Sequence, residues 1–307
     1  MNDRGSADTV ELPVPTVPVG VERPPSFSSL VQVDLAALSD TGRVRPNNED
    51  HYLIIRFGRF LETLLTNLPE GELPTRATET GYGMVVADGM GGSAAGEVAS
   101  QLAVQSLINL VLGTPDWILR PEDEYFKEMT RRAVERFHLV HRALAEQANE
   151  DYRLKGMGTT MTMAYSIGAD LLLAHVGDSR CYLFRRGLLC QLTRDHTLAH
   201  AMAEFGQIPK ETVARHRLRH VLTQVLGTGT GELRPEVELL TLEDGDCLLM
   251  CTDGLTEMVD DSTIAAVLDR AADSKKGCRL LLDLALEAGG TDNVTVLVAR
   301  YRFPTVG

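Results

Sequence analysis

The sequence predicts an α+β fold built on antiparallel or mixed sheets, for three reasons. Predicted strands and helices come in blocks rather than in strict alternation, which disfavours a doubly wound parallel sheet. Residues 158–193 contain short strand-like runs separated by Gly-Ala-Asp and Arg-Arg-Gly turns, as in an antiparallel meander. Three apolar runs end abruptly on an aspartate, at Asp88, Asp178 and Asp253. Because a buried carboxylate is costly unless it is paired or bound to a metal, these strand ends require a common explanation.

Length and composition limit the class of protein. The chain has 307 residues, of which 44% are hydrophobic, enough for one large domain or two small ones. Its net charge of −13 argues against a nucleic-acid partner, which would require a basic face. The sequence contains no apolar run that approaches the roughly 18 residues of a membrane span, and its start lacks the features of a secretory signal. Five cysteines, an odd number within mostly apolar runs, indicate reduced thiols, so we expect a cytoplasmic protein without a membrane anchor.

The composition and periodicity of the first half of the chain predict an N-terminal tail followed by mostly helical segments. Residues 1–30 are rich in Pro, Ser and Val without periodicity, which predicts a flexible tail. Residues 51–57 have the β-branched and aromatic content of a strand. Residues 94–113 predict a helix that ends at a glycine, and 122–150 predict a longer amphipathic helix.

Residues 58–81 form a predicted insert between two strands. Five apolar side chains in this segment have helical spacing, and Pro69 and Gly71 would stop the helix. Two roles remain open for its apolar face: covering a sheet edge or docking a partner.

The second half predicts strands, a surface excursion and a closing helical block. Residues 198–229 are polar, basic and helical with a proline break, which is typical of a surface segment. Residues 244–255 return to a strand, and 260–301 give two helices, a Gly-Gly turn and a last strand. The core therefore runs over residues 31–302, with 303–307 as a short C-terminal tail.

The acidic residues cluster at predicted strand ends. Glu49 and Asp50 precede the first strand, and Asp292 begins the last one. If the strands share one layered core, these acids and the three strand-end aspartates can converge on one rim. Carboxylate and carbonyl oxygens are the ligands that hard divalent cations prefer. A single Asp-Gly pair is more often a turn, but the whole set favours a metal site, where Gly89 would let its carbonyl approach an ion.

Eight sequence motifs, spread in order over nearly all of residues 31–302, resemble those of a known protein family. They are SDTGRVRPNNEDHY, VVADGMGGSAAGEVAS, GMGTTMTMA, HVGDSRCYLFRRG, LTRDHTLAHAM, VLTQVLGTG, LMCTDGLTEMV and GGTDNVTVLV. Together they resemble the type-2C family of metal-dependent serine/threonine protein phosphatases, in its bacterial branch. The resemblance implies a four-layer α-β-β-α sandwich: two antiparallel sheets flanked by helix pairs, with the site at one end.

The resemblance also implies a ligand set for two tightly bound Mn²⁺ or Mg²⁺ ions. Asp50 and Asp88 match the acids that bind the paired ions, and the carbonyl of Gly89 matches a backbone ligand. Asp253 and Asp292 match the remaining ligands of one ion. In this family the paired ions hold a bridging hydroxide that attacks the phosphorus of phosphoserine or phosphothreonine in line.

Three further residues and one segment take roles from the same resemblance. Arg45 matches the arginine that holds the substrate phosphate, with a planar fork of donors suited to phosphate oxygens. Glu49 matches an acid that orients water on the metal. Asp178 resembles the acid that recruits a third, weaker ion, and residues 198–229 correspond to the flap beside the site.

Some residues depart from the pattern or suggest other chemistry. Met90 stands where some relatives have a histidine that is a candidate general acid, so no general acid is assigned. His196 with His200, and His216 with His220, have zinc-ligand spacing but lack the glutamate of H-E-x-x-H, and surface helices explain them better. Cys247 with Cys251 could suggest zinc, but both lie among leucines.

The sequence therefore predicts a cytoplasmic, monomeric phosphatase that acts on phosphorylated proteins, serine/threonine kinases and their substrates among them. Two alternatives stay open. One is a phosphatase specialised for anti-sigma-antagonist proteins, and the other is a catalytically silent module that holds metal. The intact acids count against the silent module.

Overall fold

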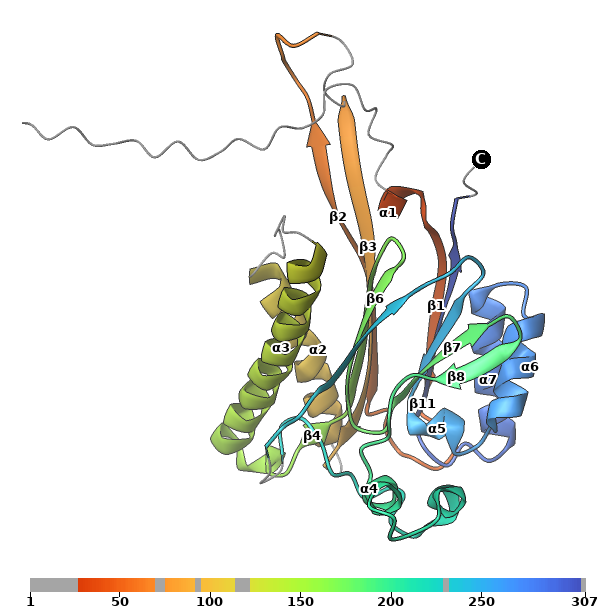
Figure 1. Cartoon of the computed structure of the whole chain (residues 1–307). Coiled ribbons are helices and arrows are strands. Elements are labelled where there is room, and N and C mark those ends of the chain that lie inside the picture. The colour runs from red at the N-terminus through yellow and green to blue at the C-terminus, as the bar shows by residue number, and fades with distance from the viewer. Residues whose placement is uncertain (1–26, 70–74, 92–94, 114–121, 229–231, 305–307) are drawn as a thin grey trace, which may run out of the picture.

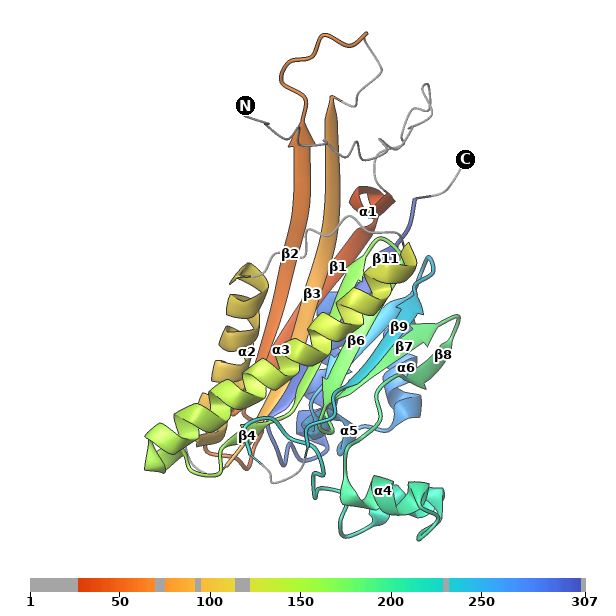
Figure 2. The same ribbon diagram turned by 60° about the vertical axis from the view of Figure 1, so that its left-hand side comes forward.

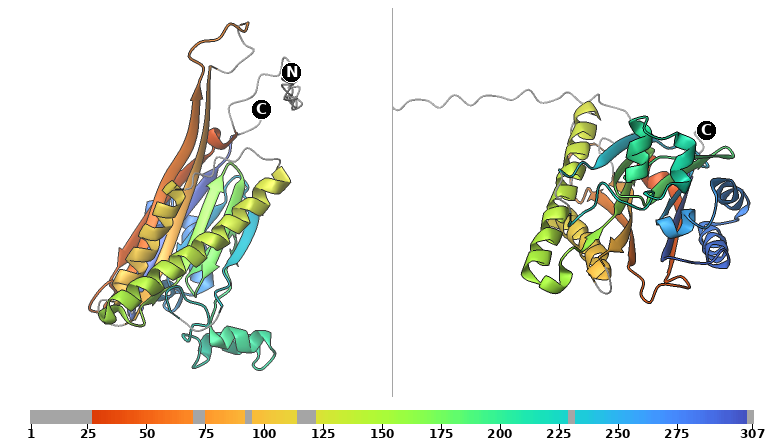
Figure 3. Two further views of the ribbon diagram at one scale, coloured as in Figure 1. Left: turned by 90° about the vertical axis from the view of Figure 1, so that its left-hand side faces the viewer. Right: turned by 90° about the horizontal axis from the view of Figure 1, so that it is seen from below.

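The protein is a sandwich of two antiparallel sheets with helices on both outer sides (Figures 1 and 3). The computed structural model describes residues 27–69, 75–91, 95–113, 122–228 and 232–304. Seen from below, the layers run in the order helices, sheet, sheet, helices (Figure 3, right). The predicted α+β sandwich is therefore confirmed.

The first sheet has the strand order β1-β11-β10-β7-β8. Its strands are β1 (Gln32–Asp40), β7 (Arg180–Arg185), β8 (Leu188–Gln191), β10 (Cys247–Cys251) and β11 (Val294–Arg302). The second sheet has the order β2-β3-β5-β6-β9, and the short β4 also pairs with β3. Its strands are β2 (Asp50–Glu62), β3 (Arg76–Met90), β4 (Gly158–Thr159), β5 (Met161–Ile167), β6 (Asp170–Val176) and β9 (Glu236–Thr241).

Helices cover the outer faces of both sheets (Figures 1 and 2). The second sheet is covered by α2 (Ala95–Gly113) and α3 (Glu122–Glu150). The first sheet is covered by α6 (Asp261–Arg270) and α7 (Ser274–Glu287), with the single turn α5 (Asp253–Thr256) beside them. The short α1 (Phe27–Leu30) precedes β1, and α4 (Leu198–Glu204) lies below the sheets with a 3₁₀ turn at Lys210–Arg215.

The central strands of both sheets are buried on both faces, which explains why β5, β6, β10 and β11 read as nearly continuous apolar runs. In β3, Met84 and Val86 pack between the sheets while Val85 faces α2 and α3, as strand alternation requires. In β10, Leu248 packs between the sheets while Leu249 faces α5–α7. Three apolar layers thus fix the strands whose ends carry the acids.

The predicted helix over residues 58–81 is wrong. β2 extends into this segment as far as Glu62 and β3 begins within it at Arg76, and the two strands pair from Asp50 opposite Asp88 to Glu62 opposite Arg76 (Figure 2). The ladder of backbone hydrogen bonds overrides the helical spacing at Phe60 and Leu61, whereas Leu64, Leu65 and Leu68 lie beyond the ladder and belong to no helix or strand. Nor does the segment cover a sheet edge: the side chains of Leu64 and Leu65 are 81% and 96% exposed. Docking of a partner here stays a prediction.

Three other predicted segments need adjustment. Residues 1–26 and 305–307 lie outside the described residues, but α1 shows that the last four residues of the predicted tail are folded: Ser28 is buried and its hydroxyl accepts a hydrogen bond from the amide of Thr80. The predicted meander over 158–193 is divided, since β5 and β6 belong to one sheet and β7 and β8 to the other. The excursion over 198–229 is only partly helical.

One helix among the described residues, α2, is long and apolar enough to cross a membrane by length and composition. In this fold Ala99, Ala103 and Leu107 of α2 pack into the core between the second sheet and α3. A core helix meets the same criteria, so this observation is weak evidence for a membrane span. All five cysteines are free thiols, and Cys190 is exposed rather than in the core.

Candidate active site

The long hairpin places the first two acids side by side. Asp50 begins β2 and lies directly opposite Asp88 near the end of β3. Residues in such cross-strand positions have Cβ atoms about 4.5–5.5 Å apart. Asp50 is buried, whereas Asp88 is half-buried and faces a cleft. The register of one ladder therefore creates a pair of adjacent carboxylates.

The other predicted acids reach the same cleft from three different connections. Asp178 lies between β6 and β7, Asp253 begins α5 directly after β10, and Asp292 precedes β11. With Asp88, they line a cleft of about 870 Å³. The other predicted site residues that line it are Arg45, Glu49 and Gly89, with Met90 beside them. The structure thus brings every predicted site residue except the more deeply buried Asp50 to the cleft wall.

Asp50 is held by two hydroxyl groups and keeps one oxygen without a hydrogen-bond partner. Its Oδ2 accepts from Thr252 Oγ1 at 2.8 Å and from Thr295 Oγ1 at 2.7 Å. Its Oδ1 is buried and has no hydrogen-bond partner in the part of the chain that the structure describes. A buried unsatisfied carboxylate oxygen is costly, and a divalent cation would satisfy it. The donor set therefore fits a hard cation.

The aspartates raise one another's pKa. Burial, opposed by its two threonine hydrogen bonds and assisted by Asp253 and Asp292, raises the pKa of Asp50 to about 7. Burial and the charge of Asp292 raise the pKa of Asp253 to about 6. Burial and neighbouring carboxylates raise the pKa values of Asp88 and Asp178 well above their ordinary range. Burial and the neighbouring negative charges thus destabilise the ionised form of each aspartate, and a bound cation would offset this effect.

Arg45 already neutralises one acid of this set. Its Nη2 lies 2.6 Å from Asp292 Oδ2, and its side chain is 53% exposed. Among the described residues, no group of three or more His, Cys, Asp or Glu side chains is arranged to hold a metal ion. Two features keep the carboxylates of the cleft apart: Asp292 is held by Arg45, and the acidic side chains repel one another.

Glycine at position 89 has a steric cause. A Cβ atom there would lie 2.1 Å from the carbonyl oxygen of Gly96 and 2.7 Å from that of Glu49. The backbone of β3 therefore passes directly between the start of β2 and the N-terminal end of α2. The amide of Gly89 donates to the Glu49 carbonyl at 3.1 Å, and Asn293 Oδ1 accepts from the Glu49 amide at 2.8 Å, which fixes Glu49 at the cleft.

Sequence reasoning missed the hydroxyl groups that position the acids. The Asp88 amide donates to Thr160 Oγ1 at 3.0 Å, and Thr160 Oγ1 lies 2.7 Å from Ser179 Oγ. Ser179 directly follows Asp178, so this contact ties two acid-bearing segments together. The Thr-Thr pair within GMGTTMTMA was the available signal, but only the folded structure shows its partners.

The surface excursion also contributes to the cleft. Arg219 and His220 of this segment line the cleft, as does Glu257, which lies outside the segment. Arg219 Nη2 lies 3.2 Å from a carboxylate oxygen of Glu257. His196, two residues before the excursion, accepts from the Gly177 amide at 3.1 Å and so helps to position the Asp178 loop.

We expect the raised pKa values to make the metal-free protein less stable as pH rises. The fold favours the protonated form of Asp50, whose pKa rises from 3.8 to about 7. This contribution to stability is fully present below about pH 4 and is lost as pH rises through about 7. In EDTA, the melting temperature of the wild type should fall relative to that of Asp50→Asn from about pH 4 upward, and the change in their difference between pH 4 and pH 8 should reach several degrees, at roughly 2–4 °C per kcal/mol.

Taking the difference between the two melting temperatures removes the contribution of titrating groups that both proteins share. One such group is His175, because burial lowers its pKa to about 3. Thermal melts followed by circular dichroism supply the measurement. A constant difference between pH 4 and pH 8 would contradict the prediction.

A two-sheet sandwich that gathers aspartates from several strand ends into one cleft is typical of a metal-dependent hydrolase. A model of the family described as "Protein phosphatase 2C" matches residues 73–284. The chain belongs to the protein phosphatase 2C family.

Relatives in bacteria are serine/threonine phosphatases by name. The chain is 36% identical to serine/threonine protein phosphatase PstP of Mycobacterium tuberculosis over 86% of its own length, but it spans only 44% of PstP. It is 31% identical to the serine/threonine phosphatase stp of Listeria innocua over 85% of its length and 92% of stp. The crystal structure of the PstP catalytic domain in complex with two manganese ions is 33% identical, covers 89% of this chain and 99% of that domain, and has a TM-score of 0.67. The predicted family and fold are confirmed.

Proposed function

We propose that this chain removes phosphate from phosphoserine and phosphothreonine in proteins, with Mn²⁺ or Mg²⁺ bound in the acidic cleft. The observation that carries the proposal is the buried, unsatisfied Oδ1 of Asp50 beside Asp88, in a cleft shared with three further aspartates. In this proposal Asp50, Asp88, Asp253, Asp292 and the Gly89 carbonyl hold the paired ions. Asp178 serves a third, weaker ion.

When bound, such ions act as Lewis acids toward phosphate oxygens and lower the pKa of water in the site. The protein's own part is to position these groups. Thr252 and Thr295 fix one oxygen of Asp50 and leave the other to point at a cation. Glu49, whose pKa burial raises, orients the attacking water. Arg45 exchanges its contact with Asp292 for the oxygens of the substrate phosphate.

The cleft suits a phosphorylated side chain on a protein surface because its entrance is bordered by the surface excursion as well as by Arg45. Phosphorylated proteins are the substrate class that the family implies. Serine/threonine kinases and their substrates, action as a monomer and a cytoplasmic location are the finer parts of this proposal.

Phosphate release from a phosphothreonine peptide tests the function. The purified chain with Mn²⁺ should release phosphate from phosphothreonine and phosphoserine peptides, and Asp88→Asn should not. A wild type that binds Mn²⁺ yet releases no phosphate from any phosphopeptide or phosphoprotein would establish the alternative, a silent metal-holding module. Activity restricted to one phosphorylated anti-sigma antagonist would establish the specialised phosphatase.

Arg45→Ala should act mainly on KM. Losing a charge-assisted hydrogen-bonded pair costs about 1.5–3 kcal/mol, or roughly 10–150-fold. Because the cleft would still hold the phosphate weakly, most of this loss should appear in KM. Steady-state kinetics at saturating Mn²⁺ measures both constants, with Arg43→Ala as a neighbouring control, since Arg43 Nε donates to the Leu286 carbonyl outside the cleft. A wild-type KM with only kcat lowered would show that Arg45 is not the phosphate clamp.

A further inference from the structure

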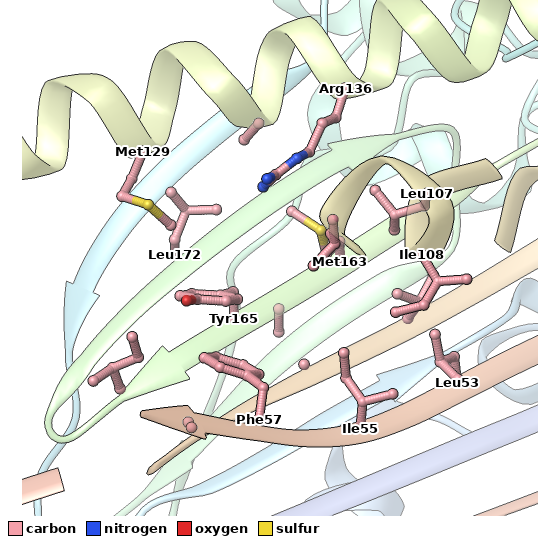
Figure 4. Close-up of a pocket in the computed structure, with 18 of the residues that line it drawn as sticks. Leu53, Ile55, Phe57, Leu107, Ile108, Met129, Arg136, Met163, Tyr165 and Leu172 are labelled. Atoms are coloured by element: carbon pink, nitrogen blue, oxygen red, sulfur yellow. The ribbon is translucent and has the colours of Figure 1, made fainter. Parts of the chain in front are cut away.

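A second cavity lies on the outer face of the second sheet, between the strands and α2 and α3 (Figure 4). Its volume is about 510 Å³, and it shares no lining residue with the acidic cleft. In β2 the acidic end is Asp50, whereas Phe57 lines this cavity further along the strand. The cavity is therefore separate from the proposed active site.

Two glycines and a stacked aromatic pair form the floor of the cavity. The rings of Phe57 and Tyr165 stack with centroids 4.6 Å apart and an interplanar angle of 15°. A Cβ atom on Gly81 would come within 2.3 Å of the Phe57 ring, and one on Gly83 within 2.9 Å of the Ile55 side chain. Glycine at both positions lets Phe57 and Ile55 lie flat against β3, which leaves the space above them open.

The walls are apolar side chains from the two helices. α2 contributes Leu107, Ile108 and Val111, and α3 contributes Met129 and Ala133 (Figure 4). Ala133 is a small side chain on a wall built otherwise of large ones, so it keeps part of the volume free.

One charged side chain reaches into this apolar space. Arg136 of α3 is only 7% exposed, and its guanidinium group points between Met129 and Met163 toward the sheet (Figure 4). Arginine stays charged at any physiological pH and carries five N–H donors. It can therefore keep a partner within the protein and still donate hydrogen bonds to an anion in the cavity.

The remaining charges lie nearer the solvent. Arg59 and Glu79 form an ion pair with each other, and Asp170 is exposed at the start of β6. The charges of Arg59 and Glu79 offset each other. Among the charged residues that line the cavity, Arg136 is therefore the most deeply buried, and it lies among apolar side chains.

We propose that this cavity binds a small amphiphile with an aliphatic body and one carboxylate. The volume lies within the roughly 300–1,000 Å³ of small-molecule sites, and an apolar lining with few polar groups is their usual character. The apolar walls suit the aliphatic body, and Arg136 suits a carboxylate as a bidentate partner. The same guanidinium disfavours a cationic amphiphile.

Calorimetric titration of the full chain with decanoate tests the site. We expect one decanoate per chain, and we expect Arg136→Met to weaken its binding roughly 10–150-fold, the loss typical of a charge-assisted contact. Arg131→Met is the matched control: it removes the same charge from the same helix, but Arg131 is 60% exposed and paired with Glu128 and Glu135, so decanoate binding should not change.

Two further binding measurements distinguish binding in the cavity from nonspecific hydrophobic adsorption elsewhere on the protein. Ala133→Leu should block decanoate by filling the cavity, and Arg136→Met should still bind the neutral analogue decanol as the wild type does. The proposal is overturned if the wild type binds no decanoate at millimolar concentration or if decyltrimethylammonium binds as well as decanoate. It is also overturned if decanoate binding survives both Arg136→Met and Ala133→Leu. If Arg136→Met does not fold, Ala133→Leu and the comparison of the three ligands still decide the question.

Discussion

Dialysis of the purified chain against EDTA should lower phosphatase activity at least about a thousandfold. Metal ions supply several kcal/mol of transition-state stabilisation in such hydrolases, and each 1.36 kcal/mol is tenfold in rate. The described residues suggest no alternative nucleophile in the cleft: Ser179 is buried and its Oγ pairs with Thr160 rather than with a histidine. Without a cation, the Oδ1 of Asp50 also stays unsatisfied.

Re-addition of Mn²⁺ to the dialysed protein should restore activity, which separates metal loss from irreversible unfolding. The assay belongs near pH 7, because the metal-free protein should be least stable at higher pH. Circular dichroism of the dialysed sample provides the control for folding. Full activity after dialysis, with no manganese detected in the sample, would contradict a metal-dependent reaction.

Three of the acids, Asp88, Asp178 and Asp253, could be found from the sequence because each one ends an apolar run. A buried strand that ends on Asp88 or Asp253 is a local signal, visible without knowing the partners of the strand. The antiparallel register then converts these local signals into one cleft, since Asp50 lies opposite Asp88 and β10 lies beside β11.

The residues that position the acids could not be found in the same way. Thr252 and Thr295 bond to Asp50 across separations of more than two hundred residues, and threonine is common in strands for reasons unrelated to catalysis. The ion pair between Arg45 and Asp292 is equally non-local, and it places a predicted phosphate ligand on a predicted metal ligand. Only the fold shows that these two roles are coupled.

The error over residues 58–81 has a related cause. The apolar spacing in this segment is helical, but spacing reports only which side chains share a face, not which backbone partner is present. β3 offers a continuous antiparallel partner up to Arg76, and Gly58 fits this pairing because a Cβ there would lie 2.4 Å from the Glu79 carbonyl oxygen. Backbone pairing therefore decides the structure up to Glu62, and the five apolar residues that had suggested a helix remain exposed.

Asp253→Asn should lower kcat by roughly a hundredfold or more at any substrate concentration. Asp253 lies at the first position of α5, directly after the buried strand β10, so the substitution keeps the shape of the side chain and removes only its charge. Even residues that merely support metal ligands cost 10–100-fold when they are changed, and a ligand itself should cost at least as much. The site would lose a negative oxygen that holds a cation, and excess substrate cannot replace that oxygen.

Steady-state kinetics at saturating Mn²⁺ decides the matter, with Asp283→Asn as the control. Asp283 is a half-exposed aspartate on α7, 3.7 Å from Arg279 and outside the cleft, so its loss should leave kcat and KM unchanged. The contrast with Arg45→Ala is the sharper test, because Asp253→Asn should lower kcat whereas Arg45→Ala should raise KM. If Asp253→Asn retains the wild-type kcat and raises only KM, then Asp253 contacts the substrate rather than the cation. The proposed ligand set would then have to be rebuilt around Asp50, Asp88 and Asp292.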